Sequence, residues 1–251
     1  MIDLNRVRVV LVETSHPGNI GASARAIKTM GLSQLYLVSP KSFPDKRAIE
    51  MSAGADDVLT DAICVSSLDE ALLGTKLVFM TSARLREIGP PVVTPEQAGI
   101  RASSHNAADI ALVFGRERIG LLKEEMLKGH YHIEIPTNPA YSSLNLSQAV
   151  QIVAYEFAKH SLCVADTNEF HRANEEPLAS FEQLESFYAH LESTLKNIGF
   201  VKPSNPKLVL YRLRRLFNRV KLEEKEVNIL RGILTQIMRV FPLNQTAKPY
   251  E

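Results

Sequence analysis

The feature of the sequence that most restricts its fold is an alternation of short apolar runs with stretches of helical pattern. The apolar runs, each bounded by polar residues, Gly or Pro, are Val7–Val12, Leu35–Val38, Leu77–Met80, Ile110–Phe114 and Tyr131–Ile135. Helix-compatible stretches that close on a glycine lie between them, at Ile20–Met30, Leu68–Leu73 and Leu121–Lys128. Such alternation, with nearly continuous apolar strands, predicts an α/β domain: a parallel sheet with helices on both faces and ligand sites at the carboxyl ends of the strands.

The pattern becomes wholly helical in the last third of the chain. A helix over Leu146–His160 closes the first domain, and residues 166–178 are polar, acidic and aperiodic, which is typical of a linker. Ser180-x-x-Gln183 resembles a capping box and predicts a helix that runs to Gly199. Two more helices are expected, over Lys207–Val220 and Glu223–Val240. We therefore expect three segments: an α/β domain over residues 1–165, a linker over 166–179 and a small all-α extension over 180–251.

Positive charge is concentrated in this C-terminal extension. The net formal charge is only +1, but residues 202–221 hold seven Lys or Arg and no acid. On an ideal helix Leu210, Leu213, Phe217 and Val220 share one face, and Arg212, Arg215 and Arg219 lie on nearly the opposite side. A merely solvated face is the alternative, but the lack of acids favours phosphate contact. The sequence thus predicts a nucleic-acid-binding face with Arg212, Arg214, Arg215 and Arg219.

Several classes of protein are not supported. The chain is 45% apolar and 23% charged, which is typical of a folded globular protein. No window approaches the about 18 consecutive apolar residues of a membrane span, and Met1–Arg8 does not resemble a signal peptide. Cys64 and Cys163 form no C-x-x-C pair, so we expect a cytoplasmic protein without disulfides. His130-x-His132-x-Glu134 alternates on one strand without a third cluster, and we expect no metal.

Two loops that follow predicted strands carry glycines beside polar residues. The turn after the first strand contains Gly18-Asn19-Ile20-Gly21, which suggests anion binding at a helix N-terminus or an ordinary turn. Asn19 and Arg25 would lie about 240° apart on an ideal helix, so they converge only if Asn19 precedes it. We therefore expect Asn19 to be a cap or loop residue. The second loop, Gly115–Gly120, packs three charges between two glycines, and a solvated surface turn is the alternative there.

A third loop follows the fifth strand, and the three loops together resemble a known family. They match, in order, the motifs of the SPOUT superfamily of S-adenosylmethionine-dependent RNA methyltransferases, in its TrmH-like, ribose 2′-O-methylating branch. The resemblance covers about residues 6–160. Its matching segments are Asn19-x-Gly21-x-x-x-Arg25, Phe114-Gly115-x-Glu117-x-x-Gly120, and Ile135-Pro136 with Ser143-Leu144-Asn145-x-Ser147.

The resemblance implies an architecture and a set of site residues. It implies a trefoil knot in the C-terminal part of the α/β domain, a homodimer, S-adenosylmethionine (SAM) as methyl donor with S-adenosylhomocysteine as product, and no metal. Arg25 would act on the ribose hydroxyl with help from Ser143 and Asn145, Glu117 would orient Arg25 or its neighbours, and Asn19 and Arg25 would serve the partner's cofactor. The implied cofactor contacts are Thr81, Ser82, Ala83, Gly115, Ile135, Ser142, Ser143 and Leu144.

The implied activity is methyl transfer to the 2′-OH of cytidine or uridine at position 32 of the tRNA anticodon loop. Because guanidinium stays protonated in proteins, Arg25 is expected to stabilise developing alkoxide charge and not to accept the proton. One alternative is a non-catalytic RNA-binding protein with a vestigial SAM pocket. Another is a nucleotide-binding oxidoreductase, which the missing G-x-G-x-x-G sequence disfavours.

Overall fold

The structure is a computed structural model that describes residues 2–84, 89–105, 109–162, 177–201 and 206–241. The chain forms two compact units, Met1–Thr167 and Asn168–Glu251, which are described separately below. Most of the segment predicted as a linker lies outside the described residues, and so does Cys163. Cys64 is a free, exposed thiol.

The first unit is built on a seven-stranded sheet in which all pairs are parallel, in the order β3-β2-β1-β6-β4-β7-β5. β1 lies near the middle, where Val10 is in register with Tyr36 of β2 and Val113 of β6. The predicted parallel sheet is thus confirmed. The strands are β1 (Val7–Val12), β2 (Gln34–Val38), β3 (Ile63–Val65), β4 (Leu77–Thr81), β5 (Val92–Val93), β6 (Ile110–Phe114) and β7 (Tyr131–Ile133).

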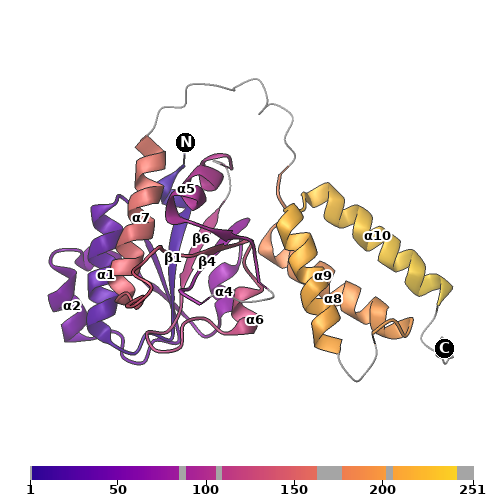
Figure 1. Cartoon of the computed structure of the whole chain (residues 1–251), viewed down its shortest axis with the longest axis horizontal. Coiled ribbons are helices and arrows are strands. Elements are labelled where there is room, and N and C mark those ends of the chain that lie inside the picture. Colours follow the sequence, from indigo (N-terminus) through magenta and orange to yellow (C-terminus); the bar gives the residue numbers. More distant parts are fainter. Residues whose placement is uncertain (1, 85–88, 106–108, 163–176, 202–205, 242–251) are drawn as a thin grey trace. The chain divides into compact units, whose positions relative to one another are not determined.

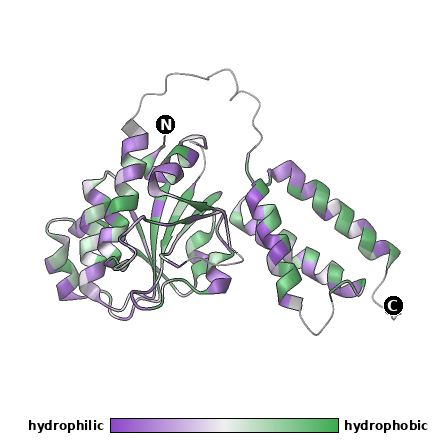
Figure 2. Cartoon of the chain, viewed as in Figure 1, coloured by the Kyte–Doolittle hydropathy of each residue, from purple (hydrophilic) through white to green (hydrophobic). Residues whose placement is uncertain are grey.

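Helices cover both faces of this sheet. Figure 1 shows α1, α2 and α7 on one side and α4 and α6 on the other, and α5 packs against α7. Successive residues of a strand point to opposite faces, so Phe79 packs edge-on against Phe157 of α7, and its neighbour Val78 is equally buried beneath the other layer. Figure 2 shows the resulting hydrophobic interior. The helices are α1 (Pro17–Thr29), α2 (Lys46–Ser52), α3 (Asp56–Thr60), α4 (Leu68–Leu72), α5 (Pro95–Ser103), α6 (Lys123–Met126) and α7 (Leu146–Leu162), after a 3-10 turn at Leu4–Arg6.

The start of α1 differs from the prediction. The helix begins at Pro17, so Asn19 lies in its first turn, and the expectation that Asn19 precedes the helix was wrong. Proline suits the first helical position because its missing N–H would be unpaired there, and the His16 side chain caps the helix by accepting the Gly18 N–H at 3.2 Å. Gly21 does not face a ligand. A Cβ there would lie 2.0 Å from the Ala48 carbonyl oxygen, so this glycine lets α2 approach α1.

The second unit is a cluster of three helices, α8 (Phe181–Asn197), α9 (Pro206–Val220) and α10 (Glu224–Val240). The capping box predicted at its start is present, with Ser180 and Gln183 bonding each other's backbone N–H. Phe187 of α8 packs edge-on against Phe217 of α9 at 5.0 Å between ring centres. Val220, predicted on the packed face, is 54% exposed, and that prediction was wrong. Within the described part of the chain, no helix is both long and apolar enough to cross a bilayer.

Candidate active site

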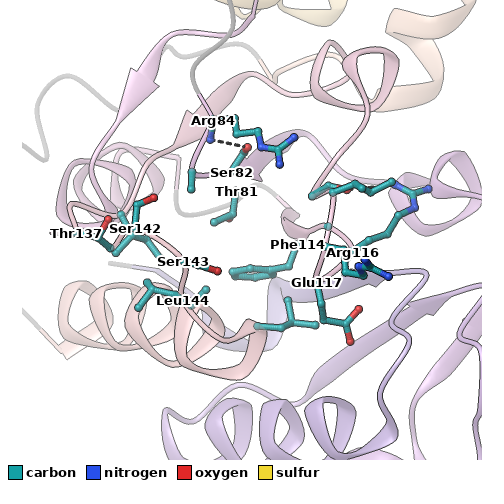
Figure 3. A pocket seen from close by; sticks show the side chains of 18 residues that line it. Thr81, Ser82, Arg84, Phe114, Arg116, Glu117, Thr137, Ser142, Ser143 and Leu144 are labelled. Carbon is teal, nitrogen blue, oxygen red and sulfur yellow. Dashed lines mark hydrogen bonds between the residues drawn. The ribbon is translucent and has the colours of Figure 1, made fainter. Parts of the chain in front are cut away.

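A cavity of about 290 Å³ opens at the carboxyl ends of three adjacent strands, β6, β4 and β7. Loops that follow these strands form its wall, together with the segment that leads into α7 (Figure 3). Every residue that the family resemblance implies as a cofactor contact lines it: Thr81, Ser82, Ala83, Gly115, Ile135, Ser142, Ser143 and Leu144. We call this cavity the cofactor pocket below.

The loop after β6 owes its shape to glycines at both ends. The backbone of Arg116 and Gly120 is joined by two hydrogen bonds, of 2.9 and 3.3 Å, which fold the loop back on itself. A Cβ on Gly115 would lie 2.3 Å from the Gly120 carbonyl carbon, and Gly120 has a φ of +68°. Both positions therefore require glycine, for close approach and for a left-handed conformation respectively.

Arg116 fastens this loop to its surroundings. Its guanidinium donates to both oxygens of Glu13, after β1, and of Glu125 in α6, where the Glu125 contacts are 2.9 and 3.0 Å. The hydrogen bonds that Arg116 donates to these two carboxylates raise the pKa of Arg116, and the same interaction lowers the pKa of Glu13. Only 12% of the Arg116 side chain is exposed, so this charge is committed to structure and is not offered to a ligand.

Glu117 points the other way and binds the start of α1. Its carboxylate accepts hydrogen bonds from the backbone N–H groups of Ser15 and His16 at 3.1 to 3.2 Å, from the Ser15 hydroxyl at 2.9 Å and from Asn19 Nδ2 at 3.0 Å. Burial alone would raise the pKa of Glu117, but these hydrogen bonds together lower it below the ordinary value. Among the described residues Glu117 has no contact with Arg25, so it holds the first turn of the helix and not the arginine itself.

Asn19 extends this contact to the third motif. Its Oδ1 accepts a hydrogen bond from Asn145 Nδ2 at 3.0 Å, and Asn145 Oδ1 accepts from the Ser147 N–H at 2.9 Å at the start of α7. A continuous chain of hydrogen bonds, Glu117–Asn19–Asn145, therefore joins the loops after β6 and β1 to the start of α7. The geometry gives these three residues a positioning role, because their polar atoms already bond one another.

Arg25 lies outside the cofactor pocket. It is exposed on α1 and lines a separate groove with residues of α7, which meets the pocket only at Leu144. The Asn19 side chain faces Glu117 and Asn145, so Asn19 and Arg25 do not converge on one point within a single chain.

The loop after β4 brings in residues that sequence reasoning missed. Arg84 lines the pocket beside Ser82, whose hydroxyl accepts the Arg84 backbone N–H at 3.1 Å (Figure 3). The His132 ring nitrogen is 2.8 Å from the Ser82 carbonyl oxygen, so this histidine on β7 supports the pocket wall. Arg84 could have been found from its place just after a predicted strand, whereas His132 gave no such signal. Among the described residues, no group of three His, Cys, Asp or Glu could hold a metal ion.

Comparison with known proteins shows the family to which this chain belongs. The SpoU rRNA methylase family matches residues 6–155, and the C-terminal domain of tRNA methyltransferase TrmJ matches residues 182–247. The tRNA (cytidine/uridine-2′-O-)-methyltransferase TrmJ of Pectobacterium atrosepticum is 50% identical over 237 residues, which cover 94% of this chain and 98% of that protein. The chain belongs to the TrmJ family of SpoU methylases.

Solved structures agree with this assignment. The crystal structure of TrmJ from Z. mobilis ZM4 matches with a TM-score of 0.80 at 34% identity and covers 92% of this chain and 98% of that one. A probable methylase family protein from Haemophilus influenzae Rd KW20 matches with a TM-score of 0.61 at 43% identity, over 97% of this chain and 100% of that one. Both likenesses extend beyond the SpoU region into the C-terminal helices.

In this TrmJ-family chain the arginines of α9 have unequal surroundings. Arg212, Arg215 and Arg219 are exposed, as predicted for a binding face. Arg214, predicted beside them, instead pairs with Glu185 of α8 and lies over the Tyr188 ring at 4.2 Å. Its guanidinium stabilises the packing of α9 on α8, because the helical period turns position 214 inward while 212, 215 and 219 stay outside.

Proposed function

We propose that this protein transfers the methyl group of SAM to the ribose 2′-OH of cytidine or uridine in tRNA. The observation that carries the proposal is the cofactor pocket: the second and third motif segments, far apart in sequence, line one cavity at the carboxyl edge of the sheet, and the hydrogen bond from Asn19 to Glu117 ties the first motif segment to its wall. The relatives at 50% identity are named for this reaction. Position 32 of the anticodon loop is the proposed target nucleotide, and the cytoplasm, where tRNA is processed, the proposed location.

The residues of the pocket fit SAM. Gly115 lines the pocket and lets the loop fold back closely on itself, because any side chain there would collide with the Gly120 backbone, so this glycine keeps the pocket wall in shape. The Thr81 hydroxyl is buried and has no hydrogen-bond partner among the described residues, which makes it a polar group that a ligand would satisfy. Phe114 and Ile135 add apolar surface for the adenine. When bound, SAM supplies a methyl group on a positively charged sulfur.

Transfer is an in-line displacement: the bond from the 2′-oxygen to the methyl carbon forms, the carbon–sulfur bond breaks, and the hydroxyl proton leaves. Glu117 is not the proton acceptor, because both of its oxygens already accept hydrogen bonds. Arg25 is not the acceptor either, because its guanidinium stays protonated. Arg25 stabilises the negative charge that develops on the oxygen, Ser143 bonds the same oxygen, and the proton passes to water or phosphate.

The separation of Arg25 from the pocket of its own chain supports a homodimer in which Arg25 serves the partner's pocket. A complementation experiment tests whether Arg25 serves the partner's pocket. Arg25→Ala and Gly115→Leu are each expected to be inactive, but a dimer that carries one copy of each variant keeps one intact composite site. Co-expressed variants with different tags are expected to recover up to about half of the wild-type activity per mixed dimer. Mixed dimers without activity would contradict the arrangement.

The C-terminal helices are proposed as the tRNA-binding part, with a methyltransferase domain over residues 1–165, a linker over 166–179 and an RNA-binding domain over 180–251. Replacing Arg212, Arg215 and Arg219 by glutamine should weaken tRNA binding without changing which nucleotide is methylated, because phosphate contacts position and do not specify. The log–log slope of affinity against salt should shrink by about 0.7 to 0.9 for each lost contact. An unchanged slope would make the face merely solvated.

The decisive experiment is incubation with isotopically labelled SAM and bulk tRNA, followed by nucleoside mass spectrometry. Labelled 2′-O-methylcytidine or 2′-O-methyluridine is expected, and sequencing of the modified tRNA should place it at position 32. A protein that binds SAM and tRNA but transfers no label would support the alternative of an RNA-binding protein with a vestigial pocket. Label on a base would refute ribose methylation.

A further inference from the structure

The described arginines of the first unit divide into two groups by the surroundings of their guanidinium groups. Four are committed to structure: Arg6 to Asp109, Arg8 to the Ala71 and Leu73 carbonyls, Arg101 to the Tyr131 ring, and Arg116 to its two glutamates. Among the described residues, the guanidinium groups of the other four make no hydrogen bond or ion pair, and each of these four lines a cavity: Arg84 and Arg118 the cofactor pocket, Arg25 its groove, and Arg47 a third cavity.

This third cavity measures about 320 Å³ and lies between the first turn of α1, the helix α2 and the start of α7. α1 and α2 lie side by side, as Figure 1 shows, because Gly21 lets them approach. The cavity adjoins the Arg25 groove, with which it shares Ala22, Ser147 and Gln148. The groove in turn reaches the cofactor pocket at Leu144, so the three cavities are contiguous along one edge of the unit.

The third cavity is lined by the Arg47 guanidinium and the His16 ring beside amide and hydroxyl side chains, and no carboxylate lines it. His16 Nδ1 accepts the Gly18 N–H, so the neutral ring carries its proton on Nε2 and can donate it to a ligand. Arg47 is exposed and offers a guanidinium fork, the geometry that matches phosphate oxygens. The neighbouring carboxylate, Asp45, does not line the cavity. It accepts hydrogen bonds from the Arg47 backbone N–H and the Ser42 hydroxyl, both at 2.8 Å, and it also interacts electrostatically with Arg47 and His16.

The cavity also lies next to the residues that organise the reaction. Asn19 and Asn145, which line it, are two links of the hydrogen-bond chain that starts at Glu117 in the cofactor pocket. In the dimer proposed above, Arg25 serves a ribose held at the partner's pocket, and because the cavity adjoins the Arg25 groove, we expect the backbone that flanks this ribose to pass along it. A phosphodiester is the part of an RNA strand that always flanks a ribose, and it is an anion that Arg and His donors recognise.

We propose that Arg47 and His16 bind a backbone phosphate of the substrate RNA next to the methylated nucleotide. The inference rests on the proposed function and adds a contact within the α/β unit to those of the C-terminal helices. Because the contact is made to the backbone, it contributes affinity and register for any substrate tRNA, without selecting the base.

The test compares Arg47→Gln with Lys46→Gln, its neighbour on α2. Lys46 is a matched control because its side chain is 91% exposed, pairs only loosely with Glu50 at 3.9 Å and does not line the cavity. Arg47→Gln is expected to raise KM for tRNA about tenfold and to reduce the salt slope of tRNA binding by about 0.7 to 0.9, with kcat and SAM affinity within twofold of wild type. Arg47→Lys should recover part of the affinity. His16→Asn, which keeps a side-chain cap for α1, should also raise KM.

Each result of these measurements either supports the phosphate contact of Arg47 or overturns it. Equal KM and salt slope for Arg47→Gln and Lys46→Gln would overturn the inference, and so would a change in oligomeric state confined to Arg47→Gln, because the cavity would then belong to a protein interface. A wild-type protein that transfers no methyl group to tRNA would overturn the proposed function instead. In that case the salt dependence of tRNA binding by the same variants still decides whether Arg47 contacts phosphate.

Discussion

Replacing Glu117 by alanine is expected to destabilise the start of α1 by about 2 to 4 kcal/mol. A hydrogen bond to a charged group contributes about 1.5 to 3 kcal/mol, and Glu117 receives such bonds from Ser15, His16 and Asn19. The sum of these separate hydrogen-bond contributions would exceed the total of about 2 to 4 kcal/mol that we expect. Ser15 and His16 are exposed, however, so water replaces part of what they lose and reduces the total.

Hydrogen exchange of peptides that cover α1, measured together with urea unfolding, gives this free energy. Glu117→Gln keeps the shape and one acceptor oxygen, so it should recover part of the protection and part of the methyltransferase activity. Glu50→Ala, an exposed glutamate with a 3.9 Å ion pair, is the control and should change stability by less than about 0.5 kcal/mol.

The effect of Glu117 should depend on pH in one direction. Its pKa in the folded protein is lower than its ordinary value of 4.5, so the carboxylate stabilises the fold fully above that value. The contribution is lost as the pH falls through the lowered pKa. The difference between wild type and Glu117→Ala should therefore be constant from about pH 5.5 to 8 and shrink below about pH 4.5. An inactive Glu117→Ala with unchanged stability and α1 protection would refute the positioning role and make Glu117 a group that acts on the substrate.

Three further predictions concern other parts of the chain. Gly115→Ala should weaken SAM binding at least about tenfold by calorimetry, because the new Cβ would lie 2.3 Å from Gly120, and tRNA affinity should hardly change. If the variant and the wild type bind SAM equally well, the cofactor pocket is not the SAM site. A fragment of residues 1–165 should fold, dimerise and bind SAM but methylate tRNA poorly, and an unfolded fragment would disprove the domain division. Arg214→Ala should lower the unfolding free energy of the C-terminal unit by about 1 to 3 kcal/mol, whereas exposed Arg215→Ala should not. Equal stabilities would exclude the contacts of Arg214 with Glu185 and Tyr188 as a source of stability.

The central strands could be predicted from sequence, but the edge strands could not. Val7–Val12 and Ile110–Phe114 match the predicted bounds because strands buried on both faces are continuously apolar. β3 and β5 were missed. They are short strands at the two edges of the sheet, where Ile63 and Val92 are each 47% exposed, so burial leaves little pattern in their sequences.

The site was predictable as a list of residues more than as an arrangement. The motif segments named the cofactor-pocket lining through family resemblance, but no spacing could show that Glu117, Asn19 and Asn145 bond one another. That contact spans 126 residues of sequence between Asn19 and Asn145. Arg214 shows a related limit, because helical spacing alone turns it away from Arg212, Arg215 and Arg219, but only the structure shows that it pairs there with Glu185 of α8. The trefoil knot rests on the resemblance alone and stays a prediction.

The strand order has a consequence for synthesis of the chain. β1 gains its second neighbour only when β6 exists, and about 100 residues separate Val12 from Ile110. At about 5 to 20 residues per second, one edge of this largely apolar strand stays unpaired for about 5 to 20 s on the ribosome. Pairings so distant in sequence also slow folding, because the intervening loop must close first. Substitutions that weaken the early β1–β2 pair should therefore reduce the yield of soluble protein more than they reduce the stability of molecules that have already folded.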